Sequence, residues 1–334
     1  MQRRHRSPST SHRSRSPTQS NVRQAMSVIK VAAAQFAPVY LDRDATTAKA
    51  ERIIAEAGAA GAKLVVFPET FLPAYPYWTL AIDPFHARQT YYPRLFDQSV
   101  ELGSETTRRL QEASRNAGVV VVMGLTEREG GTLYNSQLVI DADGKILGCR
   151  RKLMPTHHER MSYGFGSGED LKVYDTAIGK LGALVCFEHS NPLFRYAIQA
   201  QGEVIHIANW PGGLPWTDDI IDASVRQYAF EAQCFVVSVT SALSQAFIDE
   251  LGGKAAEIFK AGGGVSSIIA PGGRVIARSE TGGEELLVAE LDFAEIGRWK
   301  QMVDSFGHYA RSDVVRLHVN TAKPAAISMS PAGF

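Results

Sequence analysis

The chain has 334 residues, of which 45% are hydrophobic and 21% charged, a composition typical of a globular protein with a sizeable core. No run approaches the roughly 18 uninterrupted apolar residues of a membrane-spanning helix, so we expect a soluble protein without a membrane partner. The formal net charge is zero, but residues 1–25 hold six arginines and no acid, which leaves the rest of the chain with six more acidic than basic groups. Such an acidic body lacks the basic surface that binds nucleic acid, and we do not expect nucleic acid as a partner.

Residues 1–26 are rich in Arg, Ser and Pro and have almost nothing apolar to bury. We expect a disordered N-terminal extension there, and the apolar centre of a secretory signal is missing. A transit peptide and an arm that binds RNA or a partner remain open. We favour an upstream extension that precedes a functional start near Met26.

From residue 28 onward, short β-rich apolar runs alternate with helical stretches. The predicted strands are residues 28–36, 63–69, 119–125, 181–188, 203–210 and 234–241. The predicted helices are residues 43–60, 104–117, 191–201 and 218–232. Two predicted hairpins, residues 134–152 and 266–277, turn at Asp143-Gly144 and at Pro271-Gly272-Gly273. Several strands are apolar at consecutive positions, as strands covered on both faces are.

This order of elements predicts an α/β fold in which mixed sheets are covered by helices. We expect one continuous domain over residues 27–318. The chain becomes irregular after about residue 303, and residues 319–334 are predicted to form a flexible C-terminal tail.

Three cysteines, Cys149, Cys186 and Cys234, are too few for a disulfide framework, and their spacing matches no zinc motif. Such sparse cysteine usage is typical of a reducing compartment. We therefore expect a cytoplasmic protein with free thiols, one of which could be reactive.

Three polar residues lie where predicted strands end: Glu69, Lys152 and Cys186. In open α/β sheets, ligands bind outside the carboxyl ends of the strands. A nearby ammonium lowers the pKa of a thiol, and a carboxylate can accept the thiol proton and later activate water. The lysine, with the backbone N–H of Phe187, could also stabilise negative charge on the atom under attack.

Four segments in this order resemble the nitrilase branch of the carbon–nitrogen hydrolases. They are VVFPETFLPAYPYW (65–78), CRRKLMPTHHERMSYGFGSG (149–168), LVCFEHSNPLFRYAIQAQGEVIHIANWPG (184–212) and GHYARSDV (307–314). The resemblance implies that Cys186 is the nucleophile, Glu69 the general base and Lys152 the charge stabiliser. It also implies that Glu159 is a supporting second glutamate, although a structural salt bridge to Arg160 or another loop residue would look identical in the sequence.

The resemblance further implies an αββα sandwich that forms a homodimer or a larger homo-oligomer or filament, with contacts near His308. It implies no cofactor. We expect no metal either, because the adjacent histidines of His157-His158-Glu159 point in different directions, whereas the helical zinc motif spaces its histidines four residues apart.

One residue departs from the branch pattern: Phe187 stands where Cys-Trp-Glu normally has its tryptophan. We expect the chemistry to be kept and the pocket shape to change. Candidate substrate-binding residues are Tyr75, Phe187, His189, Asn209 and Trp210.

The predicted reaction is hydrolysis of an organic nitrile to the carboxylic acid and ammonia, through a thioimidate and then a thioester on Cys186. An amidase or carbamoylase, or a cyanide hydratase, could use the same Cys-Glu-Lys site. An alternative outside enzymes is a binding protein on a silent scaffold that recruits RNA or a partner through the arginine-rich tail. The preferred nitrile is not determined by the sequence.

Overall fold

The computed structural model describes residues 28–322. The expected N-terminal extension and residues 323–334 of the expected C-terminal tail lie outside this range. Within it, no helix has the length and apolar character needed to cross a membrane.

Two six-stranded sheets form the centre of the molecule. The first has the order β12 (Glu285–Asp292), β1 (Val28–Gln35), β2 (Ala62–Val66), β3 (Val120–Glu129), β4 (Thr132–Ile140), β5 (Ile146–Arg151). The second has the order β11 (Arg274–Arg278), β10 (Ser267–Ala270), β9 (Phe235–Thr240), β8 (Ile205–Trp210), β7 (Gly179–Val185), β6 (Tyr174–Thr176). Both sheets are mixed, because each has three central parallel strands and antiparallel strands outside them.

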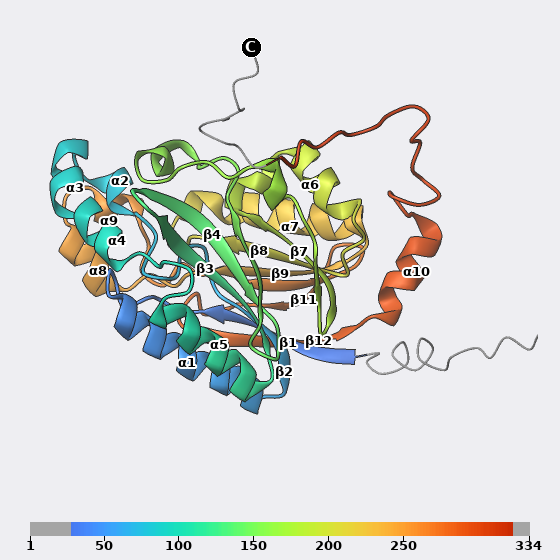
Figure 1. The fold of residues 1–334 in the computed structure, drawn as a ribbon, viewed down its shortest axis with the longest axis horizontal. Helices are drawn as coiled ribbons and strands as arrows, with labels where there is room; N and C mark the ends of the chain where they lie inside the picture. The colour runs from blue at the N-terminus through green and yellow to red at the C-terminus, as the bar shows by residue number, and fades with distance from the viewer. Residues whose placement is uncertain (1–27, 323–334) are drawn as a thin grey trace, which may run out of the picture.

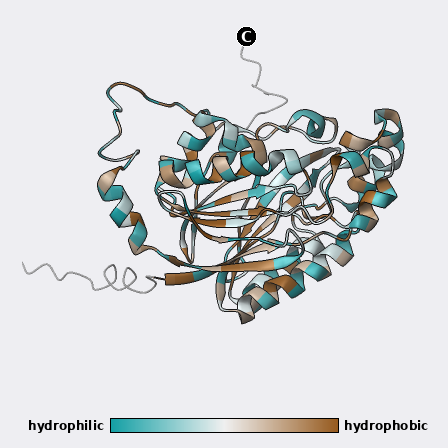
Figure 2. Cartoon of the chain, turned by 180° about the vertical axis from the view of Figure 1, so that it is seen from behind, coloured by the Kyte–Doolittle hydropathy of each residue, from teal (hydrophilic) through white to brown (hydrophobic). Residues whose placement is uncertain are grey.

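Helices cover the outer face of each sheet, which gives four layers (Figure 1). Helices α1 (Arg43–Ala59) and α5 (Glu105–Ala117) pack on the first sheet, and α6 (Pro192–Gln199) and α7 (Asp218–Ala232) pack on the second. Between the sheets, side chains such as Val31, Leu64, Ile207 and Val237 form one fully buried core. The hydropathy colouring shows apolar strands inside and polar helix faces outside (Figure 2). The expected αββα sandwich is confirmed.

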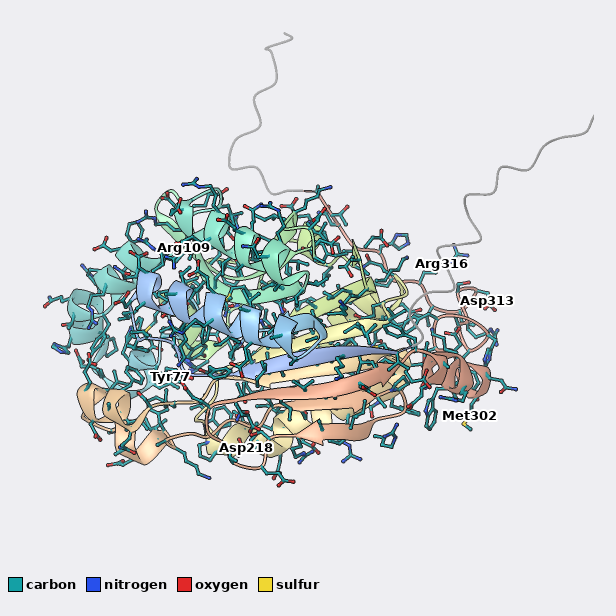
Figure 3. All side chains as sticks on the ribbon, turned by 90° about the horizontal axis from the view of Figure 1, so that it is seen from below. Tyr77, Arg109, Asp218, Met302, Asp313 and Arg316 are labelled. Carbon is teal, nitrogen blue, oxygen red and sulfur yellow. The ribbon has the colours of Figure 1, made fainter. Side chains whose placement is uncertain are left out.

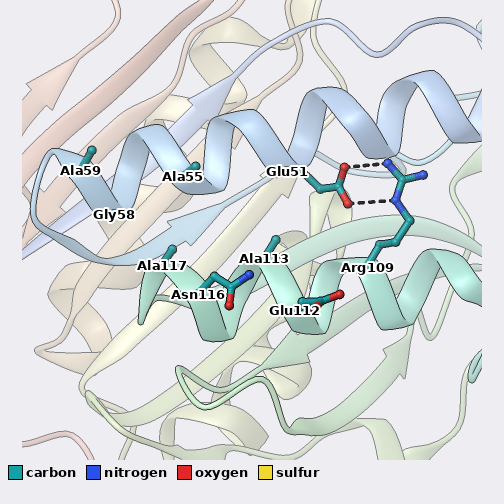
Figure 4. A pocket seen from close by; sticks show the side chains of 9 residues that line it. All are labelled: Glu51, Ala55, Gly58, Ala59, Arg109, Glu112, Ala113, Asn116 and Ala117. Atoms are coloured by element: carbon teal, nitrogen blue, oxygen red, sulfur yellow. Dashed lines mark hydrogen bonds and ion pairs between the residues drawn. The ribbon is translucent and has the colours of Figure 1, made fainter.

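Helices α1 and α5 lie side by side because small residues line their contact (Figure 4). A Cβ atom on Gly58 would lie 2.9 Å from Cβ of Ala117, so only glycine permits this approach. Arg109 and Glu51 form a two-pronged ion pair across the same groove, with N–O distances of 2.9 and 2.6 Å. The groove is a helix–helix contact on the outside of the first sheet, and none of the residues predicted for the chemistry lines it.

Several elements were not predicted from the sequence. Short helices gather around a separate aromatic cluster at one end of the molecule: α2 (Trp78–Ala81), α3 (Pro84–Thr90), α4 (Tyr92–Gln98), α8 (Gln245–Leu251) and α9 (Ala255–Ile258). At the opposite end lie α10 (Ala294–Met302) and the segment that carries Asp313 and Arg316 (Figure 3). From residue 303 to residue 322 the chain forms no helix or strand, as expected.

Strand direction decides which chain segments meet. Because β3, β4 and β5 pair in successive antiparallel steps, β5 runs in the same direction as β2 and β3. The carboxyl ends of β2 and β5 therefore lie at one edge of the first sheet. In the second sheet, β7 is parallel to β8 and β9. These strand ends carry the residues described next.

Candidate active site

Cys186 directly follows β7 and begins the 3₁₀ turn Cys186–Ser190. Its φ of 51° lies in the left-handed region, which costs a residue with a side chain about 1–3 kcal/mol. Glu188 stabilises this turn by accepting the backbone N–H groups of Val185 and Leu153, each at 2.7 Å. The same carboxylate forms a buried bidentate ion pair with Arg150 at 2.8 and 2.9 Å. Glu188 thus ties the turn at Cys186 to the segment that carries Lys152.

Lys152 directly follows β5 and lies between two carboxylates. Its Nζ donates to Glu69 Oε1 at 2.8 Å and to both carboxylate oxygens of Glu159 at 2.9 and 2.8 Å. All three side chains are buried. The side-chain N–H of Asn135 on β4 donates to Glu69 Oε1 at 2.6 Å, and the backbone carbonyl of Asn135 accepts the backbone N–H of Lys152 at 2.7 Å. Asn135 therefore sets the position of both groups.

Glu159 lies in the 3₁₀ turn His157–Met161, which a capping box with Thr156 stabilises. Glu159 Oε2 accepts the Thr156 N–H at 3.0 Å, and Oε1 accepts the Tyr75 hydroxyl at 2.9 Å. Arg160 donates instead to the carbonyl of Pro155. The salt bridge of Glu159 is thus made to Lys152, and the alternative with Arg160 is not what the structure shows.

The sulfur of Cys186 and carboxylate oxygens of Glu69 and Glu159 lie within 4.8 Å of one another. Such a group could in principle hold a metal ion, but the ammonium of Lys152 already supplies the positive charge between the carboxylates. Glu69 Oε2 is buried and has no hydrogen-bond partner among residues 28–322. One oxygen of Glu69 is thus held in place while the other is free to accept a proton.

Burial raises the pKa of Glu69 to about 7, although the charge of Lys152 acts in the opposite direction. Burial alone would lower the pKa of Lys152, but the charges of Glu159 and Glu69 outweigh it and raise that pKa well above its usual value. Burial and the charge of Glu69 raise the pKa of the Cys186 thiol well above its usual value. At neutral pH the resting group is therefore a neutral thiol beside a permanently charged lysine and a carboxyl poised to titrate.

A cavity of about 270 Å³ opens onto Cys186 and Glu159. Its walls are mostly aromatic and aliphatic: Tyr75, Leu80, Phe187, Trp210, Pro211, Leu214, Trp216 and Ile221. Phe187 stacks on Trp216 with the ring centroids 6.2 Å apart and meets Trp210 edge-on. Three of the residues expected to bind substrate, Tyr75, Phe187 and Trp210, therefore line this cavity.

His189 and Asn209, the other two, are not among its lining residues. His189 is stacked on Trp210 with the ring centroids 5.1 Å apart, and its nitrogens bond to the Cys186 carbonyl and to His206. Asn209 accepts a hydrogen bond from Gln137 at 2.6 Å within the buried core. Both side chains are buried, and neither is placed to touch a molecule in the cavity.

Sequence reasoning did not single out Asn135, Arg150 or Trp216. Asn135 begins a polar run with Ser136 and Gln137 in a hairpin strand, and this run gave no signal for which of the three reaches the site. Arg150 looked like one of two basic neighbours of Lys152, and only strand pairing shows that it is buried against Glu188. Trp216 lies in the short 3₁₀ turn Pro215–Thr217, for which the sequence pattern predicts no side-chain direction.

Comparison with known proteins supports this picture. The carbon–nitrogen hydrolase family model matches residues 30–301. The chain is 41% identical to nitrilase 3 from an unknown prokaryotic organism, over 90% of this chain and 93% of that protein. It is also 41% identical to an aliphatic nitrilase of Rhodococcus rhodochrous, over 87% of this chain and 82% of that protein.

Among solved structures, a carbon–nitrogen hydrolase from Helicobacter pylori G27 has a similar fold, with a TM-score of 0.69 at 21% identity. The match covers 86% of this chain and 96% of that one. The family model spans most of the chain, and the two nitrilases are similar over nearly their full length. The chain therefore belongs to the carbon–nitrogen hydrolase family, in its nitrilase branch.

Proposed function

We propose that the protein hydrolyses an organic nitrile to the carboxylic acid and ammonia, with Cys186 as the nucleophile. One observation carries this proposal: the buried thiol of Cys186, which lines an apolar cavity, lies within 4.8 Å of a carboxylate oxygen of Glu69, and Glu69 is paired with the charged Lys152. The curated relatives, named as nitrilases, favour the nitrile over the amide as substrate.

In the first half of the reaction, Glu69 takes the thiol proton as the sulfur of Cys186 attacks the nitrile carbon. One π bond of the nitrile breaks, and its nitrogen gains a proton from Glu69, which gives a thioimidate. Because the resting thiol is neutral, proton transfer accompanies attack, and a carboxyl with a pKa of about 7 suits this task at neutral pH.

In the second half, Glu69 removes a proton from water as the water oxygen adds to the thioimidate carbon, and passes this proton to the nitrogen. The C–N bond of the tetrahedral intermediate then breaks: the nitrogen takes the proton of the new hydroxyl and leaves as ammonia, the C=O bond forms, and a thioester remains. A second water adds in the same way and releases the carboxylic acid and the thiol. Lys152 and the backbone N–H of Phe187 stabilise negative charge at each addition step.

Glu159 supports this chemistry without taking part in bond changes. Its two hydrogen bonds to Lys152 hold the ammonium in one place and keep it charged. Tyr75 in turn donates to Glu159 and lines the cavity, so it connects the cavity wall to the charged side chains of Glu159 and Lys152. The apolar walls fit a nitrile that carries a compact apolar group.

The test is ammonia release from matched pairs of nitriles and amides, with mass spectrometry of the protein during turnover. We expect nitriles to be hydrolysed and a covalent adduct to be found on the peptide that contains Cys186. Cys186→Ala should abolish both, while Cys149→Ala, a second free cysteine outside the site, should change neither. Turnover of amides alone would show an amidase, and full activity of Cys186→Ala would refute the mechanism.

We also propose that two copies of the chain pair through helices α6 and α7. Leu193 and Phe230 on these helices expose large apolar side chains on the outer layer of the second sheet. Such a contact fits the dimer that the family resemblance implies.

We further propose a cytoplasmic location, with which the three free cysteines are in keeping.

A further inference from the structure

A line of buried hydrogen bonds leads from the backbone carbonyl of Cys186 into the core. His189 Nδ1 lies 2.7 Å from the Cys186 carbonyl oxygen, and His189 Nε2 lies 3.0 Å from His206 Nε2. His206 Nδ1 lies 2.9 Å from Glu203 Oε2, and the Tyr228 hydroxyl donates to Glu203 Oε1. All four side chains are buried. None of them has a part in the mechanism above.

The direction of these hydrogen bonds follows from the first acceptor. A carbonyl oxygen only accepts, so Nδ1 of His189 must carry the proton. If His189 is neutral, its Nε2 is then bare and must accept, which requires His206 Nε2 to donate. Burial lowers the pKa of His189 to about 3, so the ring is neutral at neutral pH. One acceptor at Cys186 thus determines the tautomers of two histidines.

The far end of the line holds one further proton, shared between His206 Nδ1 and Glu203 Oε2. Without that proton a lone pair would face a carboxylate at 2.9 Å inside the core. Burial raises the pKa of Glu203 to about 8, and burial lowers the pKa of His206 well below its usual value. Both directions place the proton on Glu203, as a neutral acid that donates to a neutral His206.

The line is also held sterically. The ring of His206 lies on Tyr228 with the centroids 3.6 Å apart, and His189 is packed between Trp210 and Tyr228. Neither histidine can rotate without displacing these rings. The charged groups that act on the two rings are paired: Arg150 with Glu188, and Arg195, which donates to the backbone carbonyl of His189, with Glu231.

We propose that His189, His206 and Glu203 are positioning residues that hold the carbonyl of Cys186 through a one-way hydrogen-bond chain, with Glu203 in its acid form at the far end. This hydrogen-bond chain holds the backbone carbonyl of Cys186, while Glu188 holds the backbone N–H of the preceding Val185. The two contacts together keep Cys186 in its left-handed conformation. This inference rests on the proposed role of Cys186 as the nucleophile. It gives these buried polar side chains a role, which is to fix the backbone geometry of Cys186.

The first test compares His189→Asn with His189→Leu. Asparagine can place an N–H donor where His189 Nδ1 lies, and leucine cannot. We expect His189→Leu to lower kcat for a nitrile about ten- to hundredfold with little change in KM, because a small displacement of the attacking atom has effects of this size. His189→Asn should recover most of that loss. Equal losses in the two variants would overturn the proposal.

A double-mutant cycle with His206→Phe tests the order of the chain, since phenylalanine keeps the ring but cannot donate to His189. We expect His206→Phe to slow the enzyme about tenfold in the wild-type background and to have little effect in the His189→Asn background, where the donor no longer depends on His206. The same cost in both backgrounds would show a packing role alone. Circular dichroism and thermal unfolding of each variant confirm that it is folded.

Two readouts do not require nitrile turnover, so they separate this inference from the proposed function. The rate of alkylation of Cys186 by iodoacetamide, followed by peptide mass spectrometry, should fall in His189→Leu and recover in His189→Asn. The infrared difference spectrum of wild type minus Glu203→Gln should contain the band of a buried neutral carboxylic acid, because the glutamine keeps both hydrogen bonds and the contribution of Glu69 cancels. An alkylation rate that does not change, or a difference spectrum without this acid band, would overturn the inference even if nitriles are hydrolysed.

Discussion

At the scale of single residues, the site combines groups whose charges depend on one another. Glu69, Lys152 and Glu159 are buried together, and each carboxylate helps keep the lysine charged. The lysine in turn limits how far burial can raise the pKa of Glu69. A single positive charge between two carboxylates leaves one of them able to take a proton near neutral pH.

The pH dependence of the reaction follows from Glu69. A general base must be unprotonated, so kcat/KM for an uncharged nitrile should fall about tenfold per pH unit below a pKa near 7 and level off above it. The check is a pH profile of kcat/KM, with enzyme returned to neutral pH afterwards to show that the acid limb is reversible. A profile without a limb near pH 7 would contradict the assignment of Glu69 as base.

Phe187 offers a residue-scale test of substrate selection. Phe187→Trp enlarges a wall side chain that is stacked on Trp216, so the cavity becomes smaller. We expect KM for a phenyl-bearing nitrile to rise about tenfold, a size consistent with the few kcal/mol that small changes in an apolar pocket are worth. KM for a short aliphatic nitrile should change little.

The matched control is the double variant Phe187→Trp with Trp216→Phe, which keeps one large and one small ring in the stack. It should recover part of the loss for the phenyl-bearing nitrile. An equal rise in KM for both substrates would mean that the substitution disturbs the turn at Cys186 instead of the cavity.

At the scale of secondary-structure elements, the ends of β5 and β7 are joined by a buried ion pair. Glu188 follows Cys186 by two residues, yet it accepts hydrogen bonds from Arg150 and from the backbone of Leu153. Most strand and helix positions were predicted, because they depend on local patterns of apolar and turn residues. The packing of the two sheets against each other, which brings the ends of β5 and β7 together, is a long-range property, and the location of this ion pair depends on it.

Glu188→Gln should destabilise the protein by about 3–5 kcal/mol, because it leaves the guanidinium of Arg150 buried without a counter-charge. Urea unfolding at neutral pH measures the change. Adding Arg150→Met to Glu188→Gln should restore part of the stability, since no unpaired charge remains. Additive losses in the double variant would show that the two residues act independently.

Lowering the pH should also reduce the free energy of unfolding, through protonation of Glu188. Burial acts to raise the pKa of Glu188, but Arg150 outweighs burial and lowers it below 4.5. Its contribution to stability is therefore present above the unfolded-state pKa of about 4.5 and is lost as the pH falls through the lower folded-state value. The wild type should accordingly lose more stability than Glu188→Gln on strong acidification.

At the scale of the whole molecule, the four layers leave the helices of the second sheet with apolar side chains in solvent. Leu193 on α6 has 59% of its surface exposed. If α6 and α7 form the dimer contact, Leu193→Asp should shift the protein toward the monomer, since a carboxylate buried at a two-fold contact faces its own copy. Sedimentation velocity over a range of concentrations gives the readout.

The matched control is Phe85→Asp, which changes an even more exposed apolar residue, 74% exposed on α3, at a different place on the molecule. It should leave the oligomeric state unchanged. A dimer that survives Leu193→Asp, or a protein that is monomeric before any substitution, would exclude this contact.

Four short motifs of the sequence were enough to indicate the family, and the resemblance they carry implied the αββα layering and singled out Glu69, Lys152, Glu159 and Cys186. Local periodicity by itself predicted only the strands and helices of mixed sheets covered by helices, because it is a property of neighbouring residues. The sequence also identified Tyr75 and Trp210, which do line the cavity.

Only the tertiary structure decided which way individual side chains point, even within those motifs. His189 and Asn209 lie in a matched segment, but the turn at Cys186 and the packing of β8 direct both side chains into the core. Asn135 reaches Glu69 because β2, which precedes Glu69, pairs with β3, and β3 pairs with β4; the pairing of β2 with β3 joins segments far apart in the chain. Side-chain direction after a turn and the pairing of distant strands depend on the whole packed core, so no local pattern encodes them.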